Sequence, residues 1–246
     1  MKLSIQEISI TIAAKGLSPT ILSPDFLKYS DIVPSDWQYE KEPVFASNGA
    51  QIAYTNGTRI MAQPNRVTFA QAFATQEQPQ FEINTIAAKF VVKLPNADYQ
   101  GVGINPRGIV PFLESEHKAH EFLFHKLLAK GSWQELGQAP AQAALQLSYV
   151  LDQGTLNLAI NEAKLNAKEQ ASGSAVIFSG NFSYPVIGDA KEKRLHSIKE
   201  RIELWQTSVT TFQQLINEHF LEVSNETSSD NGIPVAPAPN GHEMVI

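Results

Sequence analysis

Hydrophobic and polar positions alternate along the start of the chain. The apolar members of this alternation are Leu3, Ile5, Ile8, Ile10 and Ile12. A period of two is typical of a strand that is buried on one face. The alternation slips by one position near Gln6 and Glu7, and such a slip indicates a β-bulge. We therefore predict a bulged strand over residues 3–12.

Part of the sequence is present twice. Residues 51–62 and 146–159 align once two residues are inserted before the turn of the second segment. Apolar residues alternate with small or polar residues in both segments, which predicts two similar β-hairpins. The first turn is expected at Asn56-Gly57, because both residues tolerate positive φ. The matched positions are Gln51 with Gln146, Tyr54 with Tyr149, Gly57-Thr58 with Gly154-Thr155, and Ala62 with Ala159.

The period of the apolar positions changes to that of a helix in three places. Residues 79–94, 114–129 and 192–220 repeat apolar side chains at steps of three or four. In the last segment Trp205, Phe212 and Phe220 share one stripe, which we expect to pack on a sheet. Further strands are expected at 99–104 and 174–184, and a turn is expected at 105–108.

These elements predict an α+β fold made of two related halves. Each half is expected to be an antiparallel β-meander or hairpin with amphipathic helices packed on one face. The N-terminal half covers residues 1–135, and the C-terminal half, with the second hairpin and the longest helix, covers 136–223. Residues 224–246 are polar and then rich in proline and alanine, so we expect a flexible tail.

The charge of the chain narrows the range of partners. Only 18% of the residues are charged, and the formal net charge is −6. Nucleic acid requires a concentrated basic face, so we expect no nucleic-acid partner. No apolar stretch is long enough to span a bilayer, and the first residues lack the apolar core of a signal peptide. We expect a cytoplasmic protein with no membrane partner.

Two classes of cofactor site are disfavoured by the residues themselves. The chain contains no cysteine, which excludes disulfides, thiolate metal sites and cysteine nucleophiles. Gly101-Val-Gly103 invites comparison with a dinucleotide-binding loop, but Pro106 occupies the third glycine position. A β-bulge or a close crossing of helix and strand explains these glycines better. We expect no cofactor.

One segment concentrates side chains that could ligate a metal. His117, Glu121 and His125 are spaced by four residues, so they would share one face of a helix. Two imidazoles and a carboxylate can bind Zn²⁺ or Fe²⁺. The spacing differs from that of a catalytic zinc helix, which places two histidines four apart with a glutamate beside the first. The alternative interpretation is the solvated face of an amphipathic helix.

The order of elements is similar to that of a group of uncharacterised bacterial proteins of about this size. The resemblance is carried by Tyr99, Gly101 and Gly103 in one strand, and by Leu195, His196 and Ile198 in the last helix. That group has no established activity, so the resemblance implies no site residues.

We therefore expect a non-enzymatic protein that acts by protein–protein binding or self-assembly. The low charged fraction favours surfaces that a partner covers. The alternative is a metal-dependent hydrolase or oxygenase that uses His117, Glu121 and His125. A carrier with a small-ligand pocket between sheet and helices is a third hypothesis.

Overall fold

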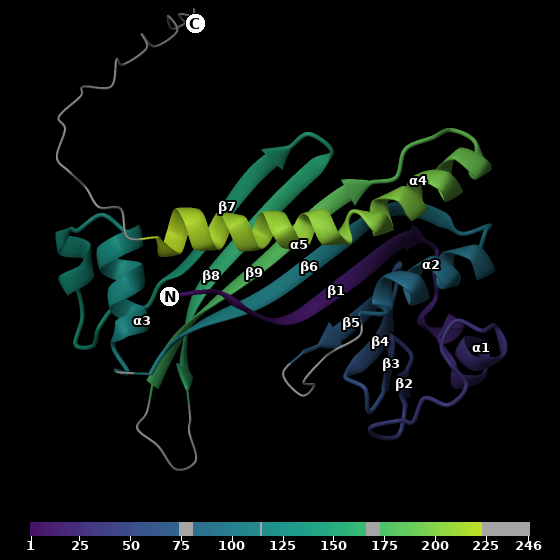
Figure 1. Ribbon diagram of the computed structural model, residues 1–246, viewed down its shortest axis with the longest axis horizontal. Helices are drawn as coiled ribbons and strands as arrows, with labels where there is room; N and C mark the ends of the chain where they lie inside the picture. Colours follow the sequence, from purple (N-terminus) through teal and green to yellow (C-terminus); the bar gives the residue numbers. More distant parts are fainter. Residues whose placement is uncertain (74–80, 114, 166–172, 223–246) are drawn as a thin grey trace, which may run out of the picture.

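The computed structural model describes residues 1–73, 81–113, 115–165 and 173–222. Within them, one antiparallel nine-stranded sheet has the order β2-β3-β4-β5-β1-β6-β9-β8-β7 (Figure 1). The predicted tail, 224–246, lies outside the described residues. The strands are β1 Ser4–Lys15, β2 Val44–Ala46, β3 Gly49–Ala53, β4 Thr58–Gln63, β5 Arg66–Ala72, β6 Asp98–Phe112, β7 Ala144–Leu151, β8 Gly154–Leu165 and β9 Gly173–Pro185.

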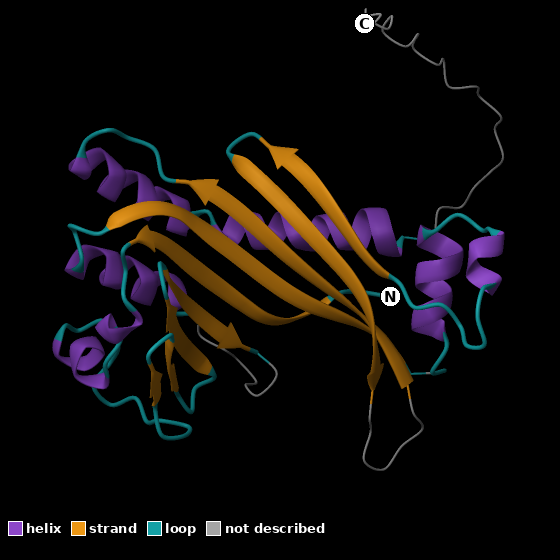
Figure 2. Cartoon of the chain, turned by 180° about the vertical axis from the view of Figure 1, so that it is seen from behind, coloured by secondary structure: helices purple, strands orange, loops and turns teal. Residues whose placement is uncertain are grey.

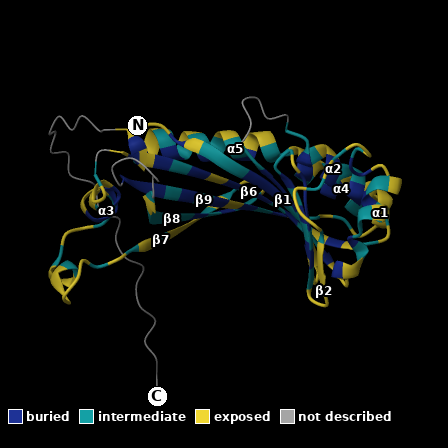
Figure 3. Ribbon diagram, turned by 90° about the horizontal axis from the view of Figure 1, so that it is seen from below, coloured by how far each residue is buried: buried dark blue, intermediate teal, exposed yellow. Residues whose placement is uncertain are grey.

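The helices that pack on the sheet lie on one of its faces (Figure 3). Helix α2 contacts β1 and β5, while α4 and α5 contact β6. Seen from behind, the opposite face of the sheet carries no helix of the described chain (Figure 2). The prediction of a mixed α+β fold is confirmed. The helical segments are η1 Pro19–Ile21, α1 Pro24–Tyr29, α2 Ile83–Lys93, α3 Lys118–Glu121, η2 Phe122–Leu127, η3 Ser132–Glu135, α4 Lys191–Glu203, α5 Trp205–Gln214 and η4 Leu215–Leu221.

Strand β1 follows the alternation of its sequence. Ile8, Ile10 and Ile12 are buried under the helices, whereas Ser9 and Thr11 lie on the open face. The pairing of β1 with β6 shifts register between Ile5 and Glu7, so the predicted bulge near Gln6 is confirmed. The open face therefore begins as a polar surface at the centre of the sheet.

The order of the strands is the same on both sides of the central β1–β6 pair. Strand β1 is followed outward by β5, β4 and β3, and β6 is followed outward by β9, β8 and β7. Each of these three-strand sets is an antiparallel meander, and its last strand pairs with the long central strand.

The prediction of a turn over 105–108 is wrong, because these residues lie inside β6. The register between β6 and β9 is interrupted after Ile104 and resumes at Arg107. Pro106 falls in this interruption, so the lack of an N–H on proline costs no inter-strand hydrogen bond there. Opposite Pro106 stands Gly180, which leaves room for the proline ring.

The helix expected over 114–129 is shorter and less regular than its sequence pattern indicates. One α-helical turn, Lys118–Glu121, continues into the π-helical segment Phe122–Leu127. The long helix expected over 192–220 is present but interrupted at Leu204. Phe212 is fully buried, while Trp205 and Phe220 are partly buried against the core.

The two repeated segments both form hairpins, but their turns differ. In the first, Gly57 has φ of 81°, and Asn56 is not among the described residues with positive φ. In the second, Leu151 pairs with Gly154 across a two-residue turn. Gly154 lacks positive φ and is needed because a side chain there would collide with the Ser183 carbonyl. Ala62 is buried on the helix face, whereas Ala159 pairs with Ser179 on the open face.

We predict that Gly180→Ala destabilises the protein whereas Gly103→Ala does not. A methyl group at Gly180 would lie 2.9 Å from Phe212 Cδ2 and 3.3 Å from Pro106 Cγ. Overpacking of this kind costs about 1–3 kcal/mol of unfolding free energy. At Gly103 the nearest side-chain atom would be Thr11 Cβ at 3.6 Å, an ordinary contact. Chemical denaturation of both variants tests this, and equal losses would contradict the packing described for Gly180.

Candidate functional site

The two edges of the sheet are built differently. Strand β2 has three residues and is preceded by Lys41, Glu42 and Pro43. Charge, proline and short length are features that protect an edge from pairing with another chain. Strand β7 has eight residues, and neither a charged residue nor a proline occurs in it. Within the described chain, β7 is therefore the unprotected edge.

Strand β7 also exposes apolar side chains. Val150, near the turn, is 90% exposed, and Leu147, in the middle of the strand, is 36% exposed. The segment that leads into β7 adds Trp133, 51% exposed, and Leu136, 84% exposed. Exposed apolar side chains at the edge of a sheet mark a surface for contact with another macromolecule, and the short strand β2 also exposes two, Val44 and Phe45.

The outward backbone groups of β7 follow from its turn. Leu151 and Gly154 close a two-residue hairpin, and such a closing pair exchanges both of its hydrogen bonds. Every second residue counted from Leu151 therefore bonds to β8. The N–H and C=O groups of the intervening residues, including Val150, Ser148 and Gln146, point away from the sheet. They can accept an added antiparallel strand.

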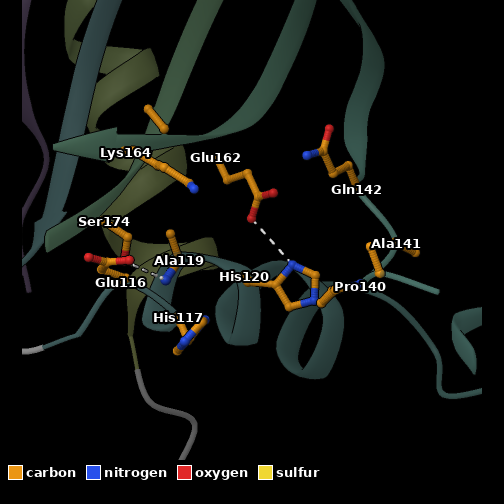
Figure 4. A pocket seen from close by; sticks show the side chains of 12 residues that line it. Glu116, His117, Ala119, His120, Pro140, Ala141, Gln142, Glu162, Lys164 and Ser174 are labelled. Carbon is orange, nitrogen blue, oxygen red and sulfur yellow. Dashed lines mark hydrogen bonds and ion pairs between the residues drawn. The ribbon is translucent and has the colours of Figure 1, made fainter. Parts of the chain in front are cut away.

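A cavity of about 420 Å³ lies just beyond the start of β7 (Figure 4). Strand β8 continues past Asn161, the residue that pairs with Ala144, so its last residues form one wall. The chain leading into β7 and the segment around α3 form the other walls. The polar side chains that line it are Glu116, His117, His120, Gln142, Glu162, Lys164 and Ser174.

Within this cavity, His120 and Glu162 form an ion pair, and Ser174 stabilises the helix start. His120 Nδ1 lies 3.3 Å from Glu162 Oε2, and the imidazole stacks on Phe124 with ring centroids 4.1 Å apart. The Ser174 hydroxyl accepts a hydrogen bond from the Ala119 N–H and donates one to the Ser115 carbonyl. Ser174 is buried and both of its hydrogen bonds are structural, so it fixes α3 against β9.

The three candidate metal ligands do not converge on a common point. His117, Glu121 and His125 are all exposed, and their segment changes from α-helix to π-helix after Glu121. Among the residues that the structure describes, no three His, Cys, Asp or Glu side chains are grouped so that they could hold a metal ion. In this segment it is His120 that lies beside a carboxylate, that of Glu162, and the four-residue spacing did not select it.

The open face of the sheet carries a second polar arrangement. Thr68, Thr11, Asn105, Asn181 and Ser183 form a chain of side-chain hydrogen bonds across β5, β1, β6 and β9. A shallow groove of about 810 Å³ lies over part of this row and extends onto the start of β8. These polar groups bond largely to one another, so they keep the face wettable without presenting a set of convergent free donors.

Two buried tyrosines have hydroxyls whose pKa is raised above the ordinary value. Burial is the cause at Tyr99, and at Tyr54 burial is the larger cause, followed by the neighbouring Tyr39. Both hydroxyls therefore stay protonated at neutral pH. Tyr99 donates to the Leu94 carbonyl at 2.8 Å, whereas the Tyr54 hydroxyl has no hydrogen-bond partner within the described part of the chain.

Comparison with known proteins finds no matching family model, no matching curated protein and no matching solved structure. The described residues contain no helix of the length and apolar character required to cross a lipid bilayer.

We predict opposite outcomes when the two buried tyrosines lose their hydroxyls. Tyr99→Phe removes the hydroxyl that donates to the Leu94 carbonyl, which keeps its bond from the Ala97 N–H, and should lower the free energy of unfolding by about 0.5–1.5 kcal/mol. Tyr54→Phe removes a hydroxyl that makes no hydrogen bond, so stability should stay equal or rise. Urea unfolding followed by circular dichroism measures both. A loss in Tyr54→Phe as large as in Tyr99→Phe would show that the Tyr54 hydroxyl is bonded in solution.

Proposed function

We propose that this is a non-enzymatic cytoplasmic protein that acts by protein–protein binding or self-assembly. In this proposal the contact is made at the outer edge of β7, where a segment of another polypeptide adds as a further antiparallel strand. The observation that carries the proposal is the eight-residue, uncharged and unprotected edge of β7.

Strand addition would satisfy the groups that β7 leaves open. The outward N–H and C=O groups would gain backbone partners, and each such hydrogen bond contributes about 0.5–1.5 kcal/mol net. The added strand would also cover Val150 and Leu147, which are exposed in the single chain. Main-chain bonds would provide affinity, and alternate side chains would provide specificity.

The two-halves interpretation belongs to the same proposal. The matching strand order on the two sides of β1 and β6 supports a duplicated unit of one long strand, a three-strand meander and a helix. In this proposal the junction between the halves lies between α2 and β6, near residue 95, instead of at residue 135, the boundary predicted from the sequence. The first strands of the two hairpins are similar in that Tyr54, just after β3, and Tyr149, in β7, both contribute their side chains to the hydrophobic core. In the second strands, aligned residues lie on opposite faces of the sheet, which corresponds to an offset of one residue: Ala62 lies on the helix face and Ala159 on the open face.

The structure adds no observation in favour of the alternative enzyme. The side chains proposed for a metal-dependent hydrolase or oxygenase, His117, Glu121 and His125, are exposed, and of the three only His117 lines the cavity beside β7. The cytoplasmic location stays a proposal, and the lack of cysteine, which excludes disulfides, is compatible with it.

We predict that charges on the edge of β7 abolish partner capture. Ser148→Lys with Val150→Lys places two charges on the edge, where an added strand would have to cover them. The matched control is Asn157→Lys with Thr155→Lys, because these residues pair with Ser148 and Val150 on the adjacent inner strand. Tagged forms of both variants and of the unmodified protein are used to capture polypeptides from a lysate of native cells.

The edge variant should retain bound polypeptides at least about tenfold less well, whereas the control should retain them. Tenfold corresponds to about 1.4 kcal/mol of binding free energy. Melting midpoints establish that both variants are folded. Capture that is equal in the edge variant and the unmodified protein would place the binding surface elsewhere.

A further inference from the structure

We propose that the strand added to β7 is β7 of a second copy of this chain, antiparallel and related by a two-fold axis through Ser148. This inference rests on the proposed function, and it names the partner. The paired strands would join two nine-stranded sheets into one continuous sheet.

Charge favours a second copy at this edge. Two chains that each carry a net charge of −6 repel one another over most of their surfaces. Strand β7 contains no charged residue, so two copies can approach there without placing like charges opposite one another. The first charge beyond the strand is Asp152, which in this register lies opposite Ala144 of the other copy.

The side chains of β7 complement one another on both faces. The helix face of the strand carries Leu145, Leu147, Tyr149 and Leu151, and the open face carries Ala144, Gln146, Ser148 and Val150. With the axis at Ser148, Leu145 lies opposite Leu151 and Leu147 lies opposite Tyr149. On the open face Val150 lies opposite Gln146. Such cross-strand apolar pairs stabilise a sheet.

The register follows from the pleat and from the ends of the strand. A shift of one residue would place helix-face residues opposite open-face residues, which the pleat forbids. With the axis at Leu147, residues of the same face again lie opposite one another. In that register, however, the Asp152-Gln153 turn of one copy extends beyond Ala144 of the other copy. There it would meet the residues where the chain of the other copy leaves the sheet. The axis at Ser148 pairs residues 145–151 and ends level with Ala144.

The other edge of the sheet fits this role poorly. Strand β2 offers three residues, and Pro43 precedes it directly. A β7–β2 contact would therefore pair fewer residues than a β7–β7 contact. The symmetric β7–β7 contact therefore pairs more residues than any other contact between the two edges of the described sheet.

Single cysteines test this register directly, because the chain contains no cysteine. In the Ser148→Cys dimer, the introduced cysteines of the two copies lie opposite one another at the two-fold axis. Their Cα atoms are about 5.5 Å apart, the separation in a hydrogen-bonded antiparallel pair. That separation lies within the range of about 4.4–6.8 Å for a disulfide. Mild oxidation should convert most of the Ser148→Cys protein to a covalent dimer. Gln63→Cys, exposed on the inner strand β4, is the control for random oxidation.

Two further single-cysteine variants distinguish association in this register from nonspecific association. Gln146→Cys and Val150→Cys should each remain uncrosslinked alone and should crosslink when the two proteins are mixed. Crosslinking of Leu147→Cys in preference to Ser148→Cys would contradict the axis proposed here.

Light scattering on the unmodified protein provides the noncovalent measurement. Its mass should rise from 27.1 kDa towards twice that value with increasing concentration. Ser148→Lys with Val150→Lys should stay at the monomer mass, and Asn157→Lys with Thr155→Lys should behave like the unmodified protein. A constant monomer mass, with Ser148→Cys no faster to crosslink than Gln63→Cys, would overturn the inference.

The two proposals fail in distinguishable ways. If the protein is monomeric but captures a different polypeptide through β7, the second-copy inference is wrong and the proposed function stands. If the protein is monomeric and capture does not depend on β7, both are wrong.

Discussion

The antiparallel pairing of β1 with β6 is the constraint on which the rest of the structure depends. Among the strand pairings of the described chain, it is the one that joins the two meanders, and it sets which face of every strand the helices cover. Ile10 faces Ile104 and Ile12 faces Val102, and all four are buried. A slip of one residue would turn these side chains to the open face and bring Ser9 and Thr11 under the helices. The hydrogen-bonded row through Thr11 and Asn105 on the open face would be lost at the same time.

The sequence predicted the fold best where local pattern and tertiary environment agree. The alternation around Ile8 to Ile12, the bulge near Gln6 and the amphipathic helix before Pro95 are local signals, and the structure confirms them. The turn predicted at 105–108 failed because Pro106 is tolerated inside a strand only where the neighbouring ladder is interrupted. Gly180 and Phe212, which pack beside Pro106 at this interruption, lie far away along the chain.

The candidate site was less predictable than the fold. The composition of β7 marks it as a strand, but its position at an edge is set by the order in which distant strands pair. Spacing grouped His117, Glu121 and His125, whereas the fold brings His120 to Glu162 on another element. The π-helical turn that begins at Phe122 alters the periodicity on which the spacing rule depends. The spacing of residues along the sequence can predict which side chains share a face of one helix or strand. It cannot predict a site such as this one, to which several elements contribute.

The inequality of the two edges has a consequence for the size of any assembly. A sheet with two usable edges can add copies at both ends, and head-to-tail addition of this kind produces open-ended filaments. Here Pro43 and the three-residue length of β2 close one end of the sheet. In the proposed dimer the two β7 edges would cover each other, so no third copy could add there and assembly would stop at two copies. In the proposed assembly, the short strand β2 would therefore prevent further copies from adding at the far edge of the sheet.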